Sequence, residues 1–260
     1  DPSVLSHTLQ FWRSWMQWIG GVGVIILTIA ILAHPGTGAF FLYRAEGREE
    51  KIYPSVTSTV RTIWWIYVLL TVLGIFLFYF AGMRWWEAIN HSMTSIATAG
   101  FSVMKNSIES YHSPLIEFAV IPIMILGAIP FFVHYRVLRG NVRALFKDVQ
   151  VRAMILLILV GILILVLENY ALYKSFLPSL RFSAFQLISG LTTTGHQTAD
   201  VHVWSPTAQI VVSLMMIIGG AAGSTAGGTK LVRAVLAYRG TGWWFRKASL
   251  PRDAIVSFKL

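Results

Sequence analysis

Long apolar runs separated by short polar segments extend through the whole chain. Runs of about 20 residues or more can cross a bilayer as helices, and they lie at 9–33, 62–82, 114–138 and 153–172. A last apolar run, 205–238, is interrupted by glycines near its middle. Because only 12% of the residues are charged and 55% are hydrophobic, the pattern predicts an all-α integral membrane protein.

Two shorter mixed runs, 84–97 and 181–192, each lead into a segment rich in Gly and Thr. Such backbone is stable at membrane depth only where protein encloses it or where it lines a watery path. One known use is a ring of carbonyls that replaces the hydration shell of an ion. The pattern therefore predicts two re-entrant loops of an ion filter, formed by Ala97, Thr98, Ala99, Gly100, Phe101, Thr192, Thr193, Thr194, Gly195 and His196.

Glycine allows consecutive carbonyls to face one axis, and threonine adds a hydroxyl, so these loops could bind a passing cation. The structural alternative is a tight turn, or a close contact between helices through small residues. One copy alone would favour that alternative, but two equivalent copies ninety-five residues apart favour the filter. The residues expected to contact potassium are Thr98, Ala99, Gly100, Thr193, Thr194 and Gly195.

A repeated unit of span, re-entrant segment and span follows from this pattern. In the closing helix of each unit a serine precedes a glycine by fourteen residues, at Ser113 and Ser205, and Ser6 shows the same spacing. The chain then divides into a closing helix of an earlier unit (1–35), a cytoplasmic loop (36–61), a second unit (62–138), a cytoplasmic loop (139–152), a third unit (153–238) and a cytoplasmic segment leading to a fourth unit (239–260). The first filter loop and the fourth unit are expected to lie outside this chain.

Basic residues gather on one side of the predicted membrane. The net charge is +10, but sixteen of the 21 Lys and Arg residues lie at 34–61, 136–152 and 229–260, which are therefore expected to face the cytoplasm. This distribution explains the charge through topology and argues against a nucleic-acid partner. Both filter loops are then reached from the outer face, and the two repeats are parallel.

A run of small residues interrupts the last apolar helix. Glycine weakens a helix by about 1 kcal/mol relative to alanine, and this run holds five within ten residues. We expect a flexible gate beneath the filter; the alternative is a surface of small residues on which helices pack. The run comprises Gly219, Gly220, Ala221, Ala222, Gly223, Ser224, Thr225, Ala226, Gly227 and Gly228.

Groups for catalysis or for a resident metal ion are not apparent in the sequence. There is no cysteine, no HExxH motif and no Ser/His/Asp set, and the histidines do not share a metal-ligand spacing on one helix. Glu87, Glu117, Glu168 and Asp200 could concentrate cations at the entrance, or could be ordinary loop and interface charges, with Asp200 as a structural cap. No enzymatic activity and no cofactor are expected.

Several segments together resemble the Trk/Ktr/HKT superfamily of potassium transporters, most closely the bacterial TrkH type. The matching segments are Phe11-Trp12-Arg13-Ser14, Gln17-Trp18-Ile19-Gly20-Gly21-Val22-Gly23, Thr98-Ala99-Gly100-Phe101-Ser102, Thr192-Thr193-Thr194-Gly195, Trp204-Ser205-Pro206 and Gly223-Ser224-Thr225-Ala226-Gly227-Gly228-Thr229-Lys230. The resemblance implies pseudo-fourfold helix–pore loop–helix units around a potassium pathway. It also implies gating at Gly219 to Gly228, a homodimer in the lipid of the bacterial plasma membrane, and a cytosolic nucleotide-binding regulatory subunit of the TrkA type.

His196 departs from the family pattern, in which a phenylalanine usually follows the third filter glycine. Its ring could pack behind the filter as a phenylalanine would, or it could be a titratable group near the outer mouth with an ordinary pKa of about 6.5. The second possibility predicts that uptake falls below about pH 6.

Two rival functions use the same features differently. A secondary transporter with broken helices would hold a small solute at the midplane, typically between inverted repeats. A membrane-embedded enzyme would need His and carboxylate groups at one depth. The parallel repeats favour a potassium-conducting pore subunit over both.

Overall fold

The computed structural model of this chain describes residues 1–23 and 56–249, and every regular element within them is a helix. The predicted all-α class is therefore confirmed. The elements are η1 (Pro2–Val4), α1 (His7–Val22), α4 (Val56–Phe80), α5 (Trp85–Ile96), η2 (Ser107–Tyr111), α6 (Pro114–Ala128), α7 (Phe131–Leu138), α8 (Arg143–Lys147), α9 (Val149–Tyr173), α10 (Phe176–Leu191), η3 (Val201–Val203), α11 (Pro206–Ile218) and α12 (Leu231–Ala248).

Two described helices, α4 and α9, are long and apolar enough to cross a membrane without a break. The predicted spans at 62–82 and 153–172 correspond to them, although both helices begin several residues earlier. The predicted span at 9–33 corresponds to α1 only as far as Val22, and its second half lies outside the described residues, as does the expected loop 36–61 for most of its length.

The run 114–138 contains Pro122, Gly127 and Pro130, which predict a bent or broken helix, and the structure has a sharp break there. The axes of α6 and α7 differ by 105° across Ile129 and Pro130. Pro130 disfavours the helical conformation for the residue before it, and Ile129 is accordingly extended, with ψ 144°. Pro122 lies inside α6 without ending it. The second proline, not the first, therefore ends the helix.

The fourteen-residue serine-to-glycine spacing starts at the N-cap of each closing helix; its glycine lies inside the last turns of α1 and α6, at Gly20 and Gly127, and ends α11 at Gly219. Ser6, Ser113 and Ser205 are the N-cap residues of α1, α6 and α11, where a serine hydroxyl accepts from a backbone N–H of the first turn. At the other end of α11, Gly219 is the C-cap residue with φ +74°, a conformation that favours glycine.

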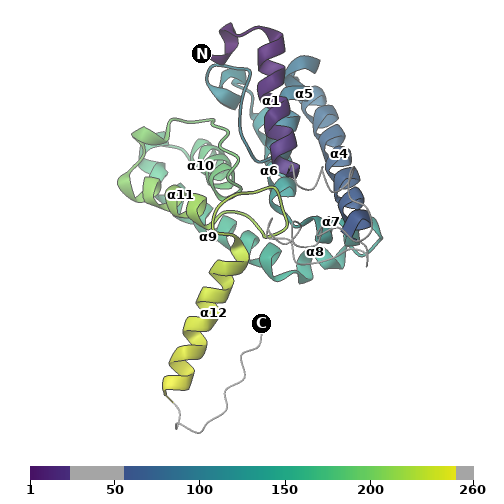
Figure 1. Cartoon of the computed structure of the whole chain (residues 1–260). Coiled ribbons are helices and arrows are strands. Elements are labelled where there is room, and N and C mark those ends of the chain that lie inside the picture. The colour runs from purple at the N-terminus through teal and green to yellow at the C-terminus, as the bar shows by residue number, and fades with distance from the viewer. Residues whose placement is uncertain (24–55, 250–260) are drawn as a thin grey trace.

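The short helices α5 and α10 occupy equivalent places. Helix α5 packs against α4 and α6 of its own unit and against α1, and α10 packs against α9 and α11 of its own unit and against α6 (Figure 1). Each re-entrant helix therefore contacts the closing helix of the preceding unit. This arrangement is what parallel units placed around a common axis require.

Helix α12 departs from the predicted boundaries. The run 205–238 was expected as one interrupted span, but its second part continues as a helix to Ala248 and projects away from the other helices (Figure 1). Leu231 at its start is the one described residue of α12 that is buried. Residues 239–248 of the segment predicted as 239–260 therefore belong to this helix.

Candidate functional site

The two Gly-Thr segments form matching bends after α5 and α10, and we call residues 97–101 the first bend and residues 192–196 the second bend. In the first bend, Ala99 N and Gly100 N both donate to Thr94 O, at 3.0 and 3.4 Å. In the second bend, Thr194 N and Gly195 N donate to Ser189 O at the same two distances, 3.0 and 3.4 Å. These four backbone N–H groups are thus turned back to the helix that precedes each bend.

Each bend contains a threonine in the left-handed conformation. Thr98 has φ +49° and Thr193 has φ +56°, and each is followed two residues later by a glycine of positive φ, Gly100 or Gly195. A β-branched residue in this conformation is a genuine outlier, and such outliers cluster at functional sites. Because the same strained conformation occurs at the equivalent threonine of both bends, it is a shared feature of the repeated unit.

The two bends touch one another. A Cβ added to Gly100 would lie 1.9 Å from Thr194 O, which no side chain could tolerate. Gly195 has positive φ as well, but an added Cβ there would meet no atom within 4 Å. Gly100 and Thr194, 94 residues apart in the sequence, therefore meet in space, and the absence of a side chain at Gly100 is a condition of that contact.

The glycine-rich loop, residues 219–228, lies against both bends. The Thr225 hydroxyl lies 2.8 Å from Ile96 O, 2.8 Å from Gly127 O and 3.3 Å from the Thr98 hydroxyl. Gly227 N donates to the Thr193 hydroxyl at 2.6 Å. The loop therefore contacts the left-handed threonine of each bend.

The ends of this loop meet in a narrow neck. A Cβ on Gly219 would lie 2.2 Å from Gly227 O, and a Cβ on Gly228 would lie 2.6 Å from Gly219 Cα. Both glycines have positive φ, +74° and +79°. Only residues without a side chain allow the two backbone segments of the neck to approach this closely.

The loop also pairs with the break between α6 and α7. Ala221 N donates to Ala128 O at 3.1 Å, and Phe131 N donates to Gly223 O at 3.0 Å. Backbone groups released by the break in one closing helix are thus satisfied by the interruption in the next, as buried backbone groups must be.

Gln17 of α1 contacts the first bend and was not predicted as a site residue. Its Nε2 donates to Ala99 O at 2.9 Å, and its Oε1 accepts from Phe101 N at 3.0 Å. A single glutamine on a helix does not change the hydrophobic periodicity. Gln17 stands out in the sequence only because it belongs to one of the segments that resemble the TrkH type. The Ala99 carbonyl of the first bend therefore points toward α1. The equivalent carbonyl of the second bend, that of Thr194, points toward Gly100 of the first bend.

His196 and Phe101, the last residues of the two bends, are placed differently. The His196 ring is 2% exposed, and its Nε2 lies 2.9 Å from the Ser95 hydroxyl while its Nδ1 lies 3.5 Å from the Ser107 hydroxyl. Phe101 is 42% exposed, and the Arg13 guanidinium lies 4.4 Å from its ring centre. The imidazole is held between α5 and η2, which agrees with the packing interpretation.

The acidic residues considered in the sequence have structural partners. Asp200 accepts from His202 N at 2.9 Å and caps η3, as predicted, and Glu168 accepts from the Ser205 hydroxyl at 2.6 Å. Glu87 accepts from Arg84 N at 3.1 Å, and Glu117 pairs with a residue of α10. Across residues 1–23 and 56–249, no group of three His, Asp or Glu residues could hold a metal ion.

A cavity of about 290 Å³ opens beside the second bend. Its lining includes Gln186, whose Oε1 is buried and has no hydrogen-bond partner among the described residues, and Thr193, Gly195 and Asp200. The lining is thus polar where it meets the bend.

The pair of bends and the loop between them can be compared with known proteins. A family model described as TrkH, cation transport protein, matches residues 1–260. The chain belongs to the TrkH family. This family is a class of cation transporters, so membership agrees with the all-helical membrane architecture and with the prediction that the chain is not an enzyme.

Individual TrkH relatives agree with this assignment. The chain is 35% identical over 261 residues to an uncharacterized cation transporter of Methanocaldococcus jannaschii, covering 98% of this chain and 52% of that protein. It is also 35% identical over 263 residues to the Trk system potassium uptake protein TrkH of Salmonella typhimurium, covering 98% of this chain and 54% of that protein. The chain thus spans about half the length of these relatives.

A solved TrkH structure has the same fold. The potassium transporter TrkH from Vibrio parahaemolyticus superposes with a TM-score of 0.85 at 28% sequence identity, over 100% of this chain and 54% of that chain. The predicted arrangement of membrane helices is confirmed by this likeness.

Proposed function

We propose that the chain forms part of a protein that takes up potassium, a monovalent cation, across the plasma membrane. Relatives bear the name Trk system potassium uptake protein. The observation that carries the proposal is the contact of two identically bonded bends at Gly100 and Thr194. Two backbone segments that enter from parallel units and meet at one place can offer their oxygens to one ion.

The filter residues of the proposal are those of the two bends. The backbone N–H groups of Ala99, Gly100, Thr194 and Gly195 donate back to their helices, so a cation would use carbonyl oxygens of the bends. The Ala99 carbonyl would share its oxygen with Gln17 Nε2. Strain at Thr98 and Thr193 keeps consecutive carbonyls from following a helical or extended course. Because these oxygens are held rigidly, the backbone would not need to rearrange when they replace the water molecules of an ion's hydration shell.

The glycine-rich loop is the gate of the proposal. It contacts both bends through Thr225 and Gly227, so its displacement would free the space beneath them. Small residues at its neck allow the backbone to change conformation at low cost. A cytosolic nucleotide-binding subunit of the TrkA type would control that displacement, and a homodimer in the bacterial inner membrane would be the working assembly.

Rubidium and sodium uptake by the full-length protein tests the proposed function. Gly100→Ala places a Cβ against Thr194 O, whereas Gly195→Ala adds only the strain of a positive φ, so rubidium uptake should fall by about a hundredfold in the first and less in the second. In both variants the preference for rubidium over sodium should fall. Gly240→Ala in α12, where an added Cβ meets no atom within 4 Å, is the matched control. An unchanged ion preference in both bend variants contradicts the filter.

A further inference from the structure

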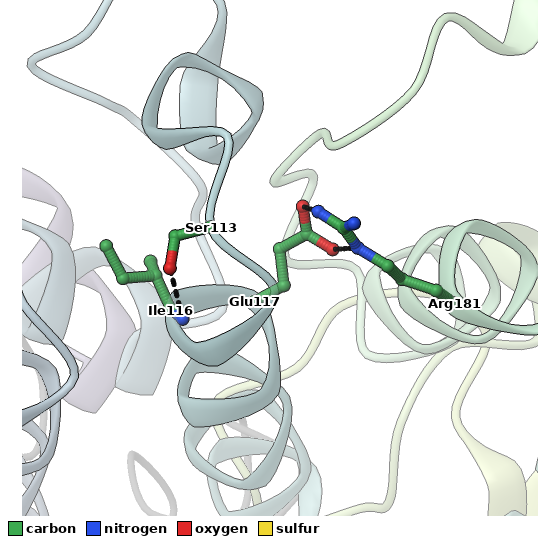
Figure 2. Close-up of polar contacts among 4 residues, drawn as sticks. All are labelled: Ser113, Ile116, Glu117 and Arg181. Atoms are coloured by element: carbon green, nitrogen blue, oxygen red, sulfur yellow. Dashed lines mark hydrogen bonds and ion pairs between the residues drawn. The ribbon is translucent and has the colours of Figure 1, made fainter. Parts of the chain in front are cut away.

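A charged contact joins the second unit to the third. Arg181 of α10 donates from Nε to Glu117 Oε2 at 2.6 Å and from Nη2 to Glu117 Oε1 at 2.7 Å, and Figure 2 shows the two groups facing each other between their helices. Glu117, in the first turn of α6, is 3% exposed. Two parallel bonds between a guanidinium and a carboxylate fix both distance and orientation.

The preceding junction uses the same two positions with different chemistry. Gln10 and Glu117 each lie four residues after the serine that caps their closing helix, and Trp86 and Arg181 each lie twelve residues before the left-handed threonine of their bend. Trp86 Nε1 donates to Gln10 Oε1 at 3.1 Å. A donor on the re-entrant helix thus meets an acceptor on the preceding closing helix at both junctions.

The third closing helix repeats part of this arrangement. Gln209 lies four residues after Ser205, and its Nε2 donates to Trp204 O at 3.1 Å. Gln10 Nε2 makes the equivalent bond to Leu5 O, at 3.3 Å. The amide of this position is therefore held by its own loop in two units, which leaves its oxygen oriented for a neighbour.

Each partner of the ion pair is connected to one bend. A Cβ on Gly127, near the end of α6, would lie 2.7 Å from Ile96 O and 2.9 Å from Thr98 Cγ2, so α6 rests directly on the first bend. Helix α10 continues from Arg181 into the second bend. Fixing one helix to the other near their starts therefore limits how far the bends can separate at their ends.

We propose that Glu117 and Arg181 are positioning residues that set the spacing of the two bends and through it the ion preference. This inference rests on the proposed function. The bends meet without room for a methyl group at Gly100, so a small shift of α10 against α6 alters the distances between their oxygens. Removing the Arg181 guanidinium leaves the buried Glu117 carboxylate without compensation, and removing the carboxylate leaves the half-buried guanidinium free to turn toward solvent; either change favours such a shift.

A double-mutant cycle in the full-length protein tests the pair. Glu117→Gln keeps the size of the side chain, and Arg181→Gln replaces the guanidinium by a shorter neutral amide. Each should lower the rubidium-to-sodium uptake ratio by about tenfold and raise the apparent KM for rubidium. The double variant should be no worse than either single variant, because each change removes the same interaction. Uptake is expressed per molecule of protein in the membrane.

Glu168→Gln is the matched control. It also removes a carboxylate near a helix end, but Glu168 accepts from Ser205 within the third unit, so the ratio should not change. If a glutamine variant fails to reach the membrane, Arg181→Lys is measured in its place; it keeps the charge but not the two-bond geometry and should lower the ratio by a smaller factor.

Unchanged ratios in the variants that reach the membrane overturn the positioning role, and so does a double variant that shows the product of the two single effects. A wild-type protein that does not prefer rubidium to sodium instead contradicts the proposed function. The two failures are therefore distinguishable.

Discussion

The two interrupted closing helices show how one position in a repeated unit can be built in two ways. After α6 the chain turns by 105° over two residues, Ile129 and Pro130, and continues as α7. After α11 it forms the glycine-rich loop of residues 219–228 before α12 begins at Leu231. The first interruption is short and fixed by a proline, and the second is long and made of small residues.

The rigid break between α6 and α7 supports the glycine-rich loop of residues 219–228 through backbone hydrogen bonds. Ala128 O and Phe131 N, which flank the proline break, pair with Ala221 N and Gly223 O of the loop. A rigid template with free backbone groups allows a glycine-rich segment to adopt one conformation despite its large entropy in the unfolded chain.

The largest effect is expected from a change that opens the neck of the loop. Gly219→Ala adds a Cβ 2.2 Å from Gly227 O at a residue with φ +74°, so the closed loop should lose about 3 kcal/mol or more. Rubidium uptake by the full-length protein should then no longer depend on its regulatory subunit. Uptake in membrane vesicles with and without that subunit is the measurement.

Gly223→Ala separates strain from overlap in the same loop. Gly223 also has positive φ, +75°, but the nearest atom to an added Cβ is 4.0 Å away, so its effect should be clearly smaller than that of Gly219→Ala. Equal effects of the two changes would show that the neck contact does not hold the loop closed.

A smaller effect is expected where the loop meets the first bend. Thr225→Val keeps the shape of the side chain but removes the hydroxyl that lies 2.8 Å from both Ile96 O and Gly127 O, at a cost of about 1–3 kcal/mol. Because these bonds exist only with the loop in place, basal rubidium uptake should rise by about tenfold.

Thr229→Val is the control for that change. The Thr229 hydroxyl donates at 3.3 Å to Ile218 O of the adjoining α11 and contacts neither bend, so basal uptake should stay as in the wild type. A similar rise in both variants would mean that the hydroxyl contact with the bend is not what closes the loop.

Local features of the fold could be predicted from the sequence because they depend on short-range chemistry. Apolar length predicted α4 and α9. Pro122, Gly127 and Pro130 predicted a bent or broken helix, and the repeated serine-to-glycine spacing identified the closing helices. The twin segments predicted two matching bends, and the resemblance to the TrkH family is confirmed by the family model.

Contacts between units could not be predicted in the same way. Gln17 reaches Ala99 from α1, and Arg181 pairs with Glu117 across 64 residues; neither partner is marked by periodicity. Each depends on how helices from different units face one another, which a pattern along one chain does not encode. Gln10 and Glu117 both lie four residues after a serine cap, but this spacing alone does not say which residue of the next unit each of them contacts.

Anomalous diffraction from crystals of the full-length protein soaked in rubidium tests the central claim most directly. A peak is expected within bonding distance of backbone oxygens from both bends, between residues 97–101 and 192–196. Peaks confined to other parts of the protein, with none between residues 97–101 and 192–196, would contradict it.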